Sequence, residues 1–386
     1  MMPHSNTLLI HAGEDPRVDG AVSMPIFQSA MYLDDGAALT HDDIRYIRLN
    51  NTPNHRALAA KLAAVSGAEA ALVTASGMAA ISAALFSCLR AGDEVLVQAD
   101  TYGGTHGLVS TELPQFGIDV TRVDGREARS WEAALTPRTR AFYVESLSNP
   151  LMQVADLESV VAFCQAHELV SIVDNTFLTP LNFRALALGF EIEVHSATKY
   201  LNGHSDLVAG VVLGSEARVK AATSILNHLG GALDPHACFL FQRGVKTLGV
   251  RMRAHNENGL RVAQFLADHP AVARVNYPGL PQHPDFERAS RLFSGFSGML
   301  SFELAGGVDA SCALIERLQL PLHAPSLGGV ESLITRPATT SHSELSPPER
   351  LALGVTDGLV RVSLGIEDAD DLVDDFAQAL DSLLER

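Results

Sequence analysis

The chain has 386 residues, 47% of them hydrophobic, which suits a globular protein of two domains, or one large domain with an appended part. Its formal net charge of −17 at pH 7 argues against nucleic acids and anionic membranes as partners. The four cysteines stand far apart without a CxxC pair, which indicates reduced thiols and argues against a disulfide framework or a zinc site.

Residues 1–55 lack a sustained hydrophobic period and carry several turn residues. We expect this segment to be either a mobile tail or an arm that packs on another subunit. The start of the chain, MMPHSNTLLIHAGED, has no basic stretch followed by a long apolar one. We therefore expect no signal peptide and a cytoplasmic protein.

The pattern predicts a helix over 57–65 and a buried strand over 70–75. The uncharged run 70–89 contains hydroxyl residues and a strand-like first half, so we interpret it as strand, turn and helix rather than a membrane span. The turn Ser76-Gly77-Met78 opens that helix, whose free amides and positive dipole end suit a phosphate group. Many helices begin this way, so the turn alone does not establish a phosphate site.

Further strands are expected at 94–98, 118–123 and 139–144, a helix at 157–167, and a buried strand that ends at Asp174. Strands that alternate with helices predict a mostly parallel sheet covered by helices. Such sheets bind ligands outside the carboxyl ends of their strands, where Asp174 lies. Pyridoxal phosphate needs a carboxylate against its ring nitrogen, although an aspartate at a strand end is also a common turn or capping residue.

The segment VHSATKYLNGHSD, residues 194–206, carries Lys199, which is flanked by small hydroxyl residues and preceded by an apolar run that resembles the end of a strand. Partial desolvation there lowers the pKa of a lysine and makes its amine a better nucleophile. Pyridoxal phosphate enzymes use such an amine for the resting Schiff base, and the hydroxyls of Ser196 and Thr198 suit a neighbouring phosphate. Taken alone, Lys199 could be an ordinary exposed lysine, and it is the combination with Asp174 that favours a cofactor site.

After a strand at 207–213, a long helix is expected to run to about residue 268, followed by strands at 272–277 and 298–304 and a helix at 369–384. This part is α+β in character. We place the domains at 1–55 (arm), 56–244 (large domain) and 245–386 (C-terminal domain). The guanidinium of Arg361, in an apolar strand-like context, matches an amino acid α-carboxylate, although a surface ion pair explains it equally well. The scattered histidines predict no metal site.

Seven runs occur in order along the chain: SGMAAI, DTYGGT, ESLSNP, VDNTF, SATKYLNGHSD, SLGGVESL and RVSLGIED. Together they resemble the Cys/Met-metabolism family of pyridoxal phosphate enzymes, which includes the cystathionine lyases and cystathionine γ-synthase. The resemblance spans residues 76–368 and implies a fold-type I enzyme with a mostly parallel large domain and a smaller α+β domain.

The resemblance also implies roles for individual residues. Lys199 and Tyr102 are the implied catalytic residues, with Tyr102 stacked on the pyridine ring. The implied cofactor contacts are Ser76, Gly77, Met78, Tyr102, Asn149, Asp174, Ser196, Thr198 and Lys199. Tyr46 and Arg48 would reach the cofactor phosphate of a neighbouring subunit, in a homotetramer built from dimers that share active sites. The implied substrate contacts are Asn149, Ser326, Glu331 and Arg361.

Glu331 favours cystathionine γ-lyase-type γ-elimination, since a carboxylate there suits the distal ammonium of cystathionine; a glutamate on a loop is otherwise usually a solvated charge. Cystathionine γ-synthase-type replacement on an O-acylhomoserine and cystathionine β-lyase activity are the alternatives within the family. Outside the family, the alternative functions are an aminotransferase and a pyridoxal-binding sensor without turnover. The chain departs from the family pattern at Asn51-Thr52-Pro53, where threonine and proline are inverted, and at His106, near which relatives often carry an arginine.

Overall fold

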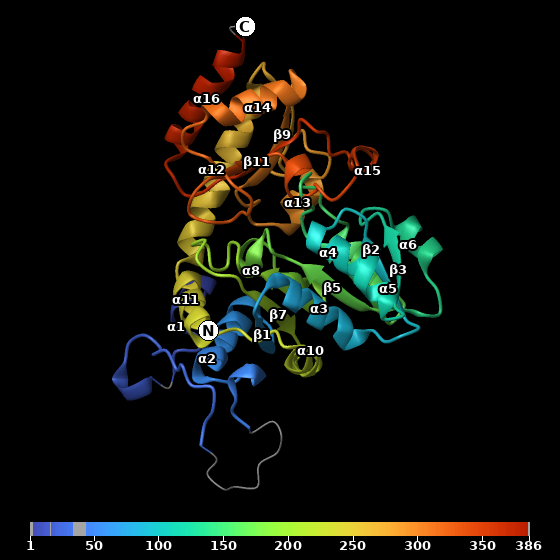
Figure 1. Cartoon of the computed structure of the whole chain (residues 1–386), viewed down its shortest axis with the longest axis vertical. Helices are drawn as coiled ribbons and strands as arrows, with labels where there is room; N and C mark the ends of the chain where they lie inside the picture. Colours follow the sequence, from blue (N-terminus) through green and yellow to red (C-terminus); the bar gives the residue numbers. More distant parts are fainter. Residues whose placement is uncertain (1–2, 16, 34–43, 385–386) are drawn as a thin grey trace.

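The computed structural model of the chain describes residues 3–15, 17–33 and 44–384. Two sheets dominate this part of the chain, and each has its own covering helices (Figure 1). The blue to yellow segments build the larger sheet and its helices, and the orange to red C-terminal segments lie above them.

The large sheet has seven strands in the order β1 (Ala70–Thr74), β7 (Gly210–Gly214), β6 (Ile192–Ser196), β5 (Val170–Asp174), β4 (Thr139–Glu145), β2 (Glu94–Gln98) and β3 (Asp119–Val123). Only β7 is antiparallel to its neighbours, so the prediction of a mostly parallel sheet is confirmed. Residues 197–209, between β6 and β7, contain no crossover helix, and a short connection of this kind reverses the chain direction. Lys199 lies in this connection.

Alternate residues of the central strands face two different hydrophobic cores. On β4, Phe142 and Val144 belong to one core, whereas Ala141 and Tyr143 belong to the other. Because neighbours along a strand point to opposite faces, both faces of the sheet are buried.

Helices cover both faces of the sheet. The helices of this domain, with the short first helix, are α1 (Ser5–His11), α2 (Pro53–Ser66), α3 (Gly77–Cys88), α4 (Gly103–Gly107), α5 (Leu113–Gln115), α6 (Ala128–Ala134), α7 (Leu157–Ala166), α8 (Thr179–Asn182), α9 (Ala185–Leu188), α10 (Glu216–Leu229) and α11 (Pro235–Val245). Buried residues of α3 and α10 pack on one face, and those of α2, α7 and α11 on the other. The run 70–89 thus forms β1 and α3, as expected, and no helix among the described residues is long and apolar enough to span a membrane.

The C-terminal part packs around a mixed sheet of five strands in the order β10 (Leu322–His323), β11 (Leu333–Thr335), β12 (Val360–Ser363), β9 (Met299–Leu304) and β8 (Val272–Asn276). Its helices are α12 (Leu248–Asp268), α13 (Phe286–Leu292), α14 (Gly307–Arg317), α15 (Pro347–Ala352) and α16 (Ala369–Leu384). The long helix expected to end near residue 268 is interrupted between α11 and α12. The domain boundary at 244/245 stays a prediction.

The N-terminal segment begins with helix α1, which the sequence did not reveal because seven residues carry too little periodicity. This helix packs on α2 and α12 of its own chain, where Leu9 is buried. The assignment of 1–55 as an arm to another subunit stays a prediction, and residues 34–43 of it lie outside the described ranges. The inverted Thr52-Pro53 pair starts α2: Thr52 is its N-cap and Pro53 its first residue, positions that these residue types favour.

Candidate active site

A cavity of about 600 Å³ lies at the carboxyl ends of β4, β5 and β6, where segments of the C-terminal domain close over the sheet. It brings together most of the predicted site residues: Ser76, Gly77, Met78, Tyr102, Asn149, Asp174, Ser196, Thr198, Lys199, Ser326 and Arg361. This is the edge of a parallel sheet at which α/β proteins bind their ligands.

The N-terminus of α3 forms one wall of this cavity. The Ser76 hydroxyl caps the helix and accepts a hydrogen bond from the amide of Ala79 (3.0 Å). A Cβ atom on Gly77 would lie 2.8 Å from the Cβ of Ser196, so only glycine lets the helix approach β6 this closely. The first amides of α3 therefore lie beside Ser196 at one end of the cavity, an arrangement that suits a phosphate group.

Lys199 lies between the sheet and the C-terminal domain. Its Nζ donates a hydrogen bond to the Ser326 hydroxyl (2.7 Å). Burial, with a smaller contribution from the positive charge of Arg361, lowers the pKa of Lys199 to about 8. The backbone of Ser326 has a φ of 96°, which non-glycine residues rarely adopt and which tends to occur at functional sites.

Asp174 ends β5 and faces the cavity. Its Oδ1 accepts hydrogen bonds from the amide (2.9 Å) and hydroxyl (2.5 Å) of Thr176, and its Oδ2 accepts one from the Tyr143 hydroxyl (3.3 Å). Burial raises the pKa of Asp174, and the bonds from Thr176 oppose this effect. These three donors are neutral, so a cation in the cavity, such as a protonated ring nitrogen, would further stabilise the charged form of the carboxylate.

Arg361 enters the cavity from β12. Its guanidinium donates hydrogen bonds to Asn149 Oδ1 (3.0 Å) and to the carbonyl of Ser326 (3.3 Å). Burial lowers its pKa to about 10. A buried guanidinium beside Lys199 favours an anionic ligand, such as a carboxylate.

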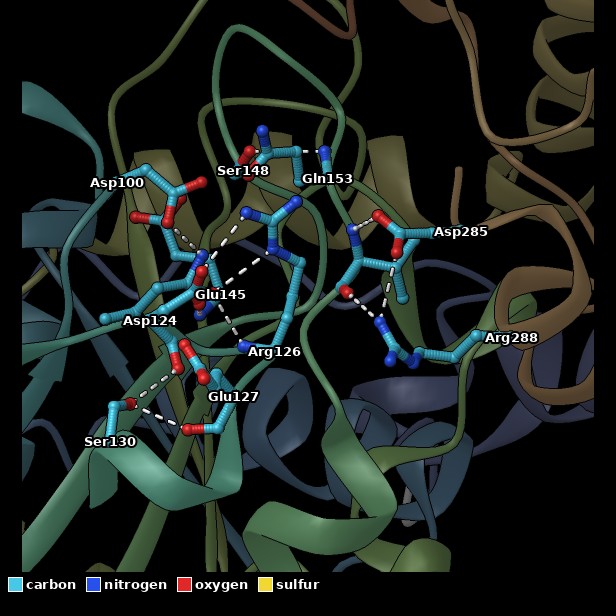
Figure 2. A network of polar contacts seen from close by, with 12 residues as sticks. Asp100, Asp124, Arg126, Glu127, Ser130, Glu145, Ser148, Gln153, Asp285 and Arg288 are labelled. Atoms are coloured by element: carbon cyan, nitrogen blue, oxygen red, sulfur yellow. Dashed lines mark hydrogen bonds and ion pairs between the residues drawn. The ribbon is translucent and has the colours of Figure 1, made fainter. Parts of the chain in front are cut away.

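The loop that carries Asn149 is held by the C-terminal domain. Asp285 accepts a hydrogen bond from the amide of Val154 (3.0 Å), and Arg288 donates one to the carbonyl of the same residue (2.8 Å; Figure 2). Arg288 and Asp285 also form an ion pair (3.1 Å). The position of Asn149 therefore depends on contacts between distant parts of the sequence.

Three predicted residues lie outside this cavity. Glu331 lines a neighbouring pocket of about 520 Å³, which shares Ser326 and other wall residues with the cavity, and it accepts a hydrogen bond from the Ser205 hydroxyl. Tyr46 and Arg48 line neither pocket. Arg48 instead donates to the carbonyl of Asn227 (2.8 Å) and lies over the ring of Tyr46.

Sequence reasoning missed several wall residues, including Glu145, Thr176 and Ser341. Glu145 carried the same signal as Asp174, an acid at the end of an apolar strand. Ser341 comes from an irregular segment with no local pattern. Among the described residues no cluster of potential ligands could hold a metal ion.

The arrangement defines a class of enzyme. The cavity contains an amine of lowered pKa, a buried carboxylate, helix amides beside hydroxyl groups, and a guanidinium. These groups match the aldehyde, ring nitrogen and phosphate of pyridoxal phosphate and the carboxylate of an amino acid. Fold and cavity together are those of fold-type I pyridoxal phosphate enzymes.

Comparison with known proteins narrows this class. Residues 6–381 match the family described as Cys/Met metabolism PLP-dependent enzyme, and the chain belongs to this family. It is 41% identical to L-methionine gamma-lyase of Pseudomonas putida, over 98% of both chains, and 42% identical to cystathionine gamma-synthase of Mycobacterium leprae, over 97% of both. The crystal structure of cystathionine gamma-lyase from Lactobacillus plantarum, complexed with L-serine, superposes with a TM-score of 0.94 at 38% identity and covers 99% of this chain and 100% of that one.

Family membership confirms the prediction that pyridoxal phosphate is the cofactor. It also confirms that the protein is an enzyme of sulfur amino acid metabolism. The three relatives carry the names of three different reactions at similar identity, so similarity alone does not select one of them.

Proposed function

We propose that the protein cleaves cystathionine by γ-elimination, which with water yields cysteine, 2-oxobutanoate and ammonia. The observation that carries the proposal is the second pocket, which adjoins the cavity and contains Glu331. Cystathionine is a sulfur-bridged double amino acid, and its far end bears an ammonium group that needs an anionic partner. Methionine ends in a methyl group, which forms no ion pair with a carboxylate at this position.

The residues of the cavity divide the remaining tasks. The bound cofactor supplies an aldehyde for the substrate amine and a ring that accepts an electron pair. Burial lowers the pKa of Lys199 to about 8, so its amine loses its proton more readily than that of an ordinary lysine, and the unprotonated amine would take the proton from the α-carbon of the substrate. Arg361 would bind the α-carboxylate, and Asp174 would keep the ring nitrogen protonated. Lys199 or Tyr102 donates the proton that the leaving sulfur needs.

The keto acid formed from cystathionine by the pure, cofactor-loaded protein tests the reaction. We expect 2-oxobutanoate together with cysteine. Pyruvate would mean cleavage at the β-carbon and would refute the proposal. If no keto acid forms, two further assays follow. Incubation with O-acylhomoserine and cysteine tests for the synthase reaction, and incubation of an amino acid with 2-oxoglutarate tests for an aminotransferase. A protein inactive in all three assays would be the sensor.

A variant of Glu331 tests the role of the second pocket. In Glu331→Gln the distal ammonium loses its charged partner, worth about 1.5 kcal/mol, so we expect KM for cystathionine to rise about tenfold. KM for methionine serves as the internal control and should stay unchanged. An equal change for both substrates would mean that Glu331 acts on the common part of the site.

We also propose a cytoplasmic homotetramer in which residues 1–55 reach a neighbouring subunit and place Tyr46 and Arg48 in its cavity. Support comes from the position of both residues outside the cavity of their own chain and from exposed apolar residues, Met31 and Leu33, in the same segment. Mixing an inactive Arg48→Ala protein with an inactive Lys199→Ala protein should restore part of the activity. Failure to restore activity after subunit exchange would argue against shared sites.

A further inference from the structure

Glu145 is a buried acid in the cavity wall to which the mechanism above gives no task. It ends β4 and lies opposite Asp174 of β5 in the parallel register of the two strands. Both side chains line the cavity. Two acids on adjacent strands thus face the same cavity.

The carboxyl group of Glu145 holds the segment that carries Tyr102. Its Oε1 accepts a hydrogen bond from the backbone amide of Tyr102 (2.6 Å), the residue that precedes α4. The strand around Glu145 is fixed in turn by Gln98, whose side chain accepts from the amide of Glu145 (3.0 Å) and donates to Asp100 (2.9 Å). Figure 2 shows Asp100 and Glu145 near one another in this network. The orientation of Tyr102 at the cavity mouth therefore depends on this carboxyl group.

The groups that face Glu145 make a negative charge on it unfavourable. Asp174 lies beside it on β5, Tyr143 precedes it on the same face of β4, and Asp100 and Tyr102 come from the segment after β2. Two buried carboxyl groups this close do not both ionise readily. Asp174 receives three hydrogen bonds from side-chain and backbone donors, whereas the bond from Tyr102 is the one that supports Glu145. The negative charge is therefore better placed on Asp174.

The cations of the cavity are engaged elsewhere. Lys199 donates to Ser326, and Arg361 donates to Asn149. The charged groups that act on Glu145 are the acids Asp174 and Asp100, and together with burial they raise the pKa of Glu145 well above its usual range.

We propose that Glu145 is a positioning residue that works as a neutral carboxyl group: it holds the amide of Tyr102, turns an O–H donor toward the cofactor site, and leaves Asp174 as the one negative charge there. The proposal rests on the cavity being the cofactor site and does not depend on which bond of the substrate is cleaved.

The variants Glu145→Gln and Glu145→Leu separate this role from a structural one. Glutamine keeps an acceptor for the Tyr102 amide and a donor toward the cavity without a charge, so kcat should stay within about twofold of the wild type, with the same pH profile. Leucine lacks the acceptor, and kcat should fall about tenfold. Equal losses in both variants, or a changed pH profile in Glu145→Gln, would overturn the proposal.

Infrared spectroscopy reads the protonation state without substrate. The difference spectrum between wild type and Glu145→Gln at pH 7 should contain the C=O stretch of a protonated carboxylic acid, in the cofactor-loaded and the cofactor-free protein. Glu94→Gln is the matched control: Glu94 is as little exposed to solvent as Glu145, and burial acts to raise its pKa, but hydrogen bonds from three threonine hydroxyls lower it, so its difference spectrum should show carboxylate bands. Carboxylate bands for Glu145 as well would refute the neutral form, whatever the reaction proves to be.

Discussion

Replacing Lys199 by methionine should make the cofactor-free protein more stable at neutral pH while abolishing its activity. Burial lowers the pKa of Lys199 from 10.5 to about 8. The unfolded state therefore binds more protons than the folded state between these two values, and the stability of the wild type rises with pH in this window. Below pH 8 the folded protein carries the full cost of a buried ammonium group. Methionine keeps most of the side-chain volume and removes this cost.

The pKa shift sets the size of the effect. Linkage gives a cost of about 3 kcal/mol at pH 7, which falls to about 1 kcal/mol at pH 9.5. Two effects reduce the gain expected from removing this charge. The variant loses the hydrogen bond to Ser326, and solvent at the cavity already screens part of the charge in the wild type; together they subtract about 1 kcal/mol. We therefore expect Lys199→Met to raise the free energy of unfolding by about 2 kcal/mol at pH 7 and to leave it nearly unchanged at pH 9.5.

Urea unfolding of both cofactor-free proteins, at equal protein concentration and at both pH values, measures this difference. The same variant should form no keto acid from sulfur amino acids. A gain of the same size at both pH values would show that packing, and not charge, is responsible. A loss of stability at pH 7 would refute the reasoning from burial, and full activity would refute the role of Lys199.

Lys61→Met is the contrasting control. Lys61 is fully buried and burial lowers its pKa as well, but its Nζ has partners: it donates to the carbonyls of Leu9 (2.9 Å) and Ile10 (3.1 Å) and pairs with Glu14 (3.3 Å). Removing it leaves a buried carboxylate with less compensation and removes two hydrogen bonds between α2 and α1, so the free energy of unfolding should fall by about 3 kcal/mol. A gain in stability here would mean that buried pairing counts for little in this protein.

Two further predictions concern the cavity. Asp174→Asn removes the carboxylate but keeps its size, and should lower kcat by about 100-fold or more, measured as keto acid formation at saturating cofactor; a loss below tenfold would contradict its role at the ring nitrogen. In Gly77→Ala the new Cβ meets Ser196 at 2.8 Å and displaces the start of α3, so the Kd for the cofactor, followed by absorbance, should rise about tenfold. Gly107→Ala, whose Cβ would meet nothing within 4 Å, should leave the Kd unchanged.

The elements with a strong local signal were predicted closely. Strand β2 occupies the predicted residues 94–98, and α16 the predicted range 369–384. The strand expected at 207–213 begins later, at Gly210, because the connection that carries Lys199 extends to that point. Hydrophobic periodicity identifies an element well, but its ends are set by hydrogen bonds to neighbours that are distant in the sequence.

The sequence by itself determined the alternation of strands and helices, the parallel character of the large sheet, and the two residues from which the cofactor was predicted. Lys199 and Asp174 follow from local chemistry, since Asp174 ends a buried strand, Lys199 follows the end of the next strand by three residues, and the ends of parallel strands meet at one edge. The seven motifs, which occur in order along the chain, also predicted the family to which the protein belongs.

Only the tertiary structure decided which groups share the cavity. That Glu145 lies beside Asp174 follows from the adjacency of β4 and β5, and that Glu331 faces a separate pocket follows from the packing of the C-terminal domain on the sheet. The physical reason is that protonation and affinity depend on burial and on neighbouring charges, and these neighbours are brought together by contacts across the chain and not by the residues next in sequence.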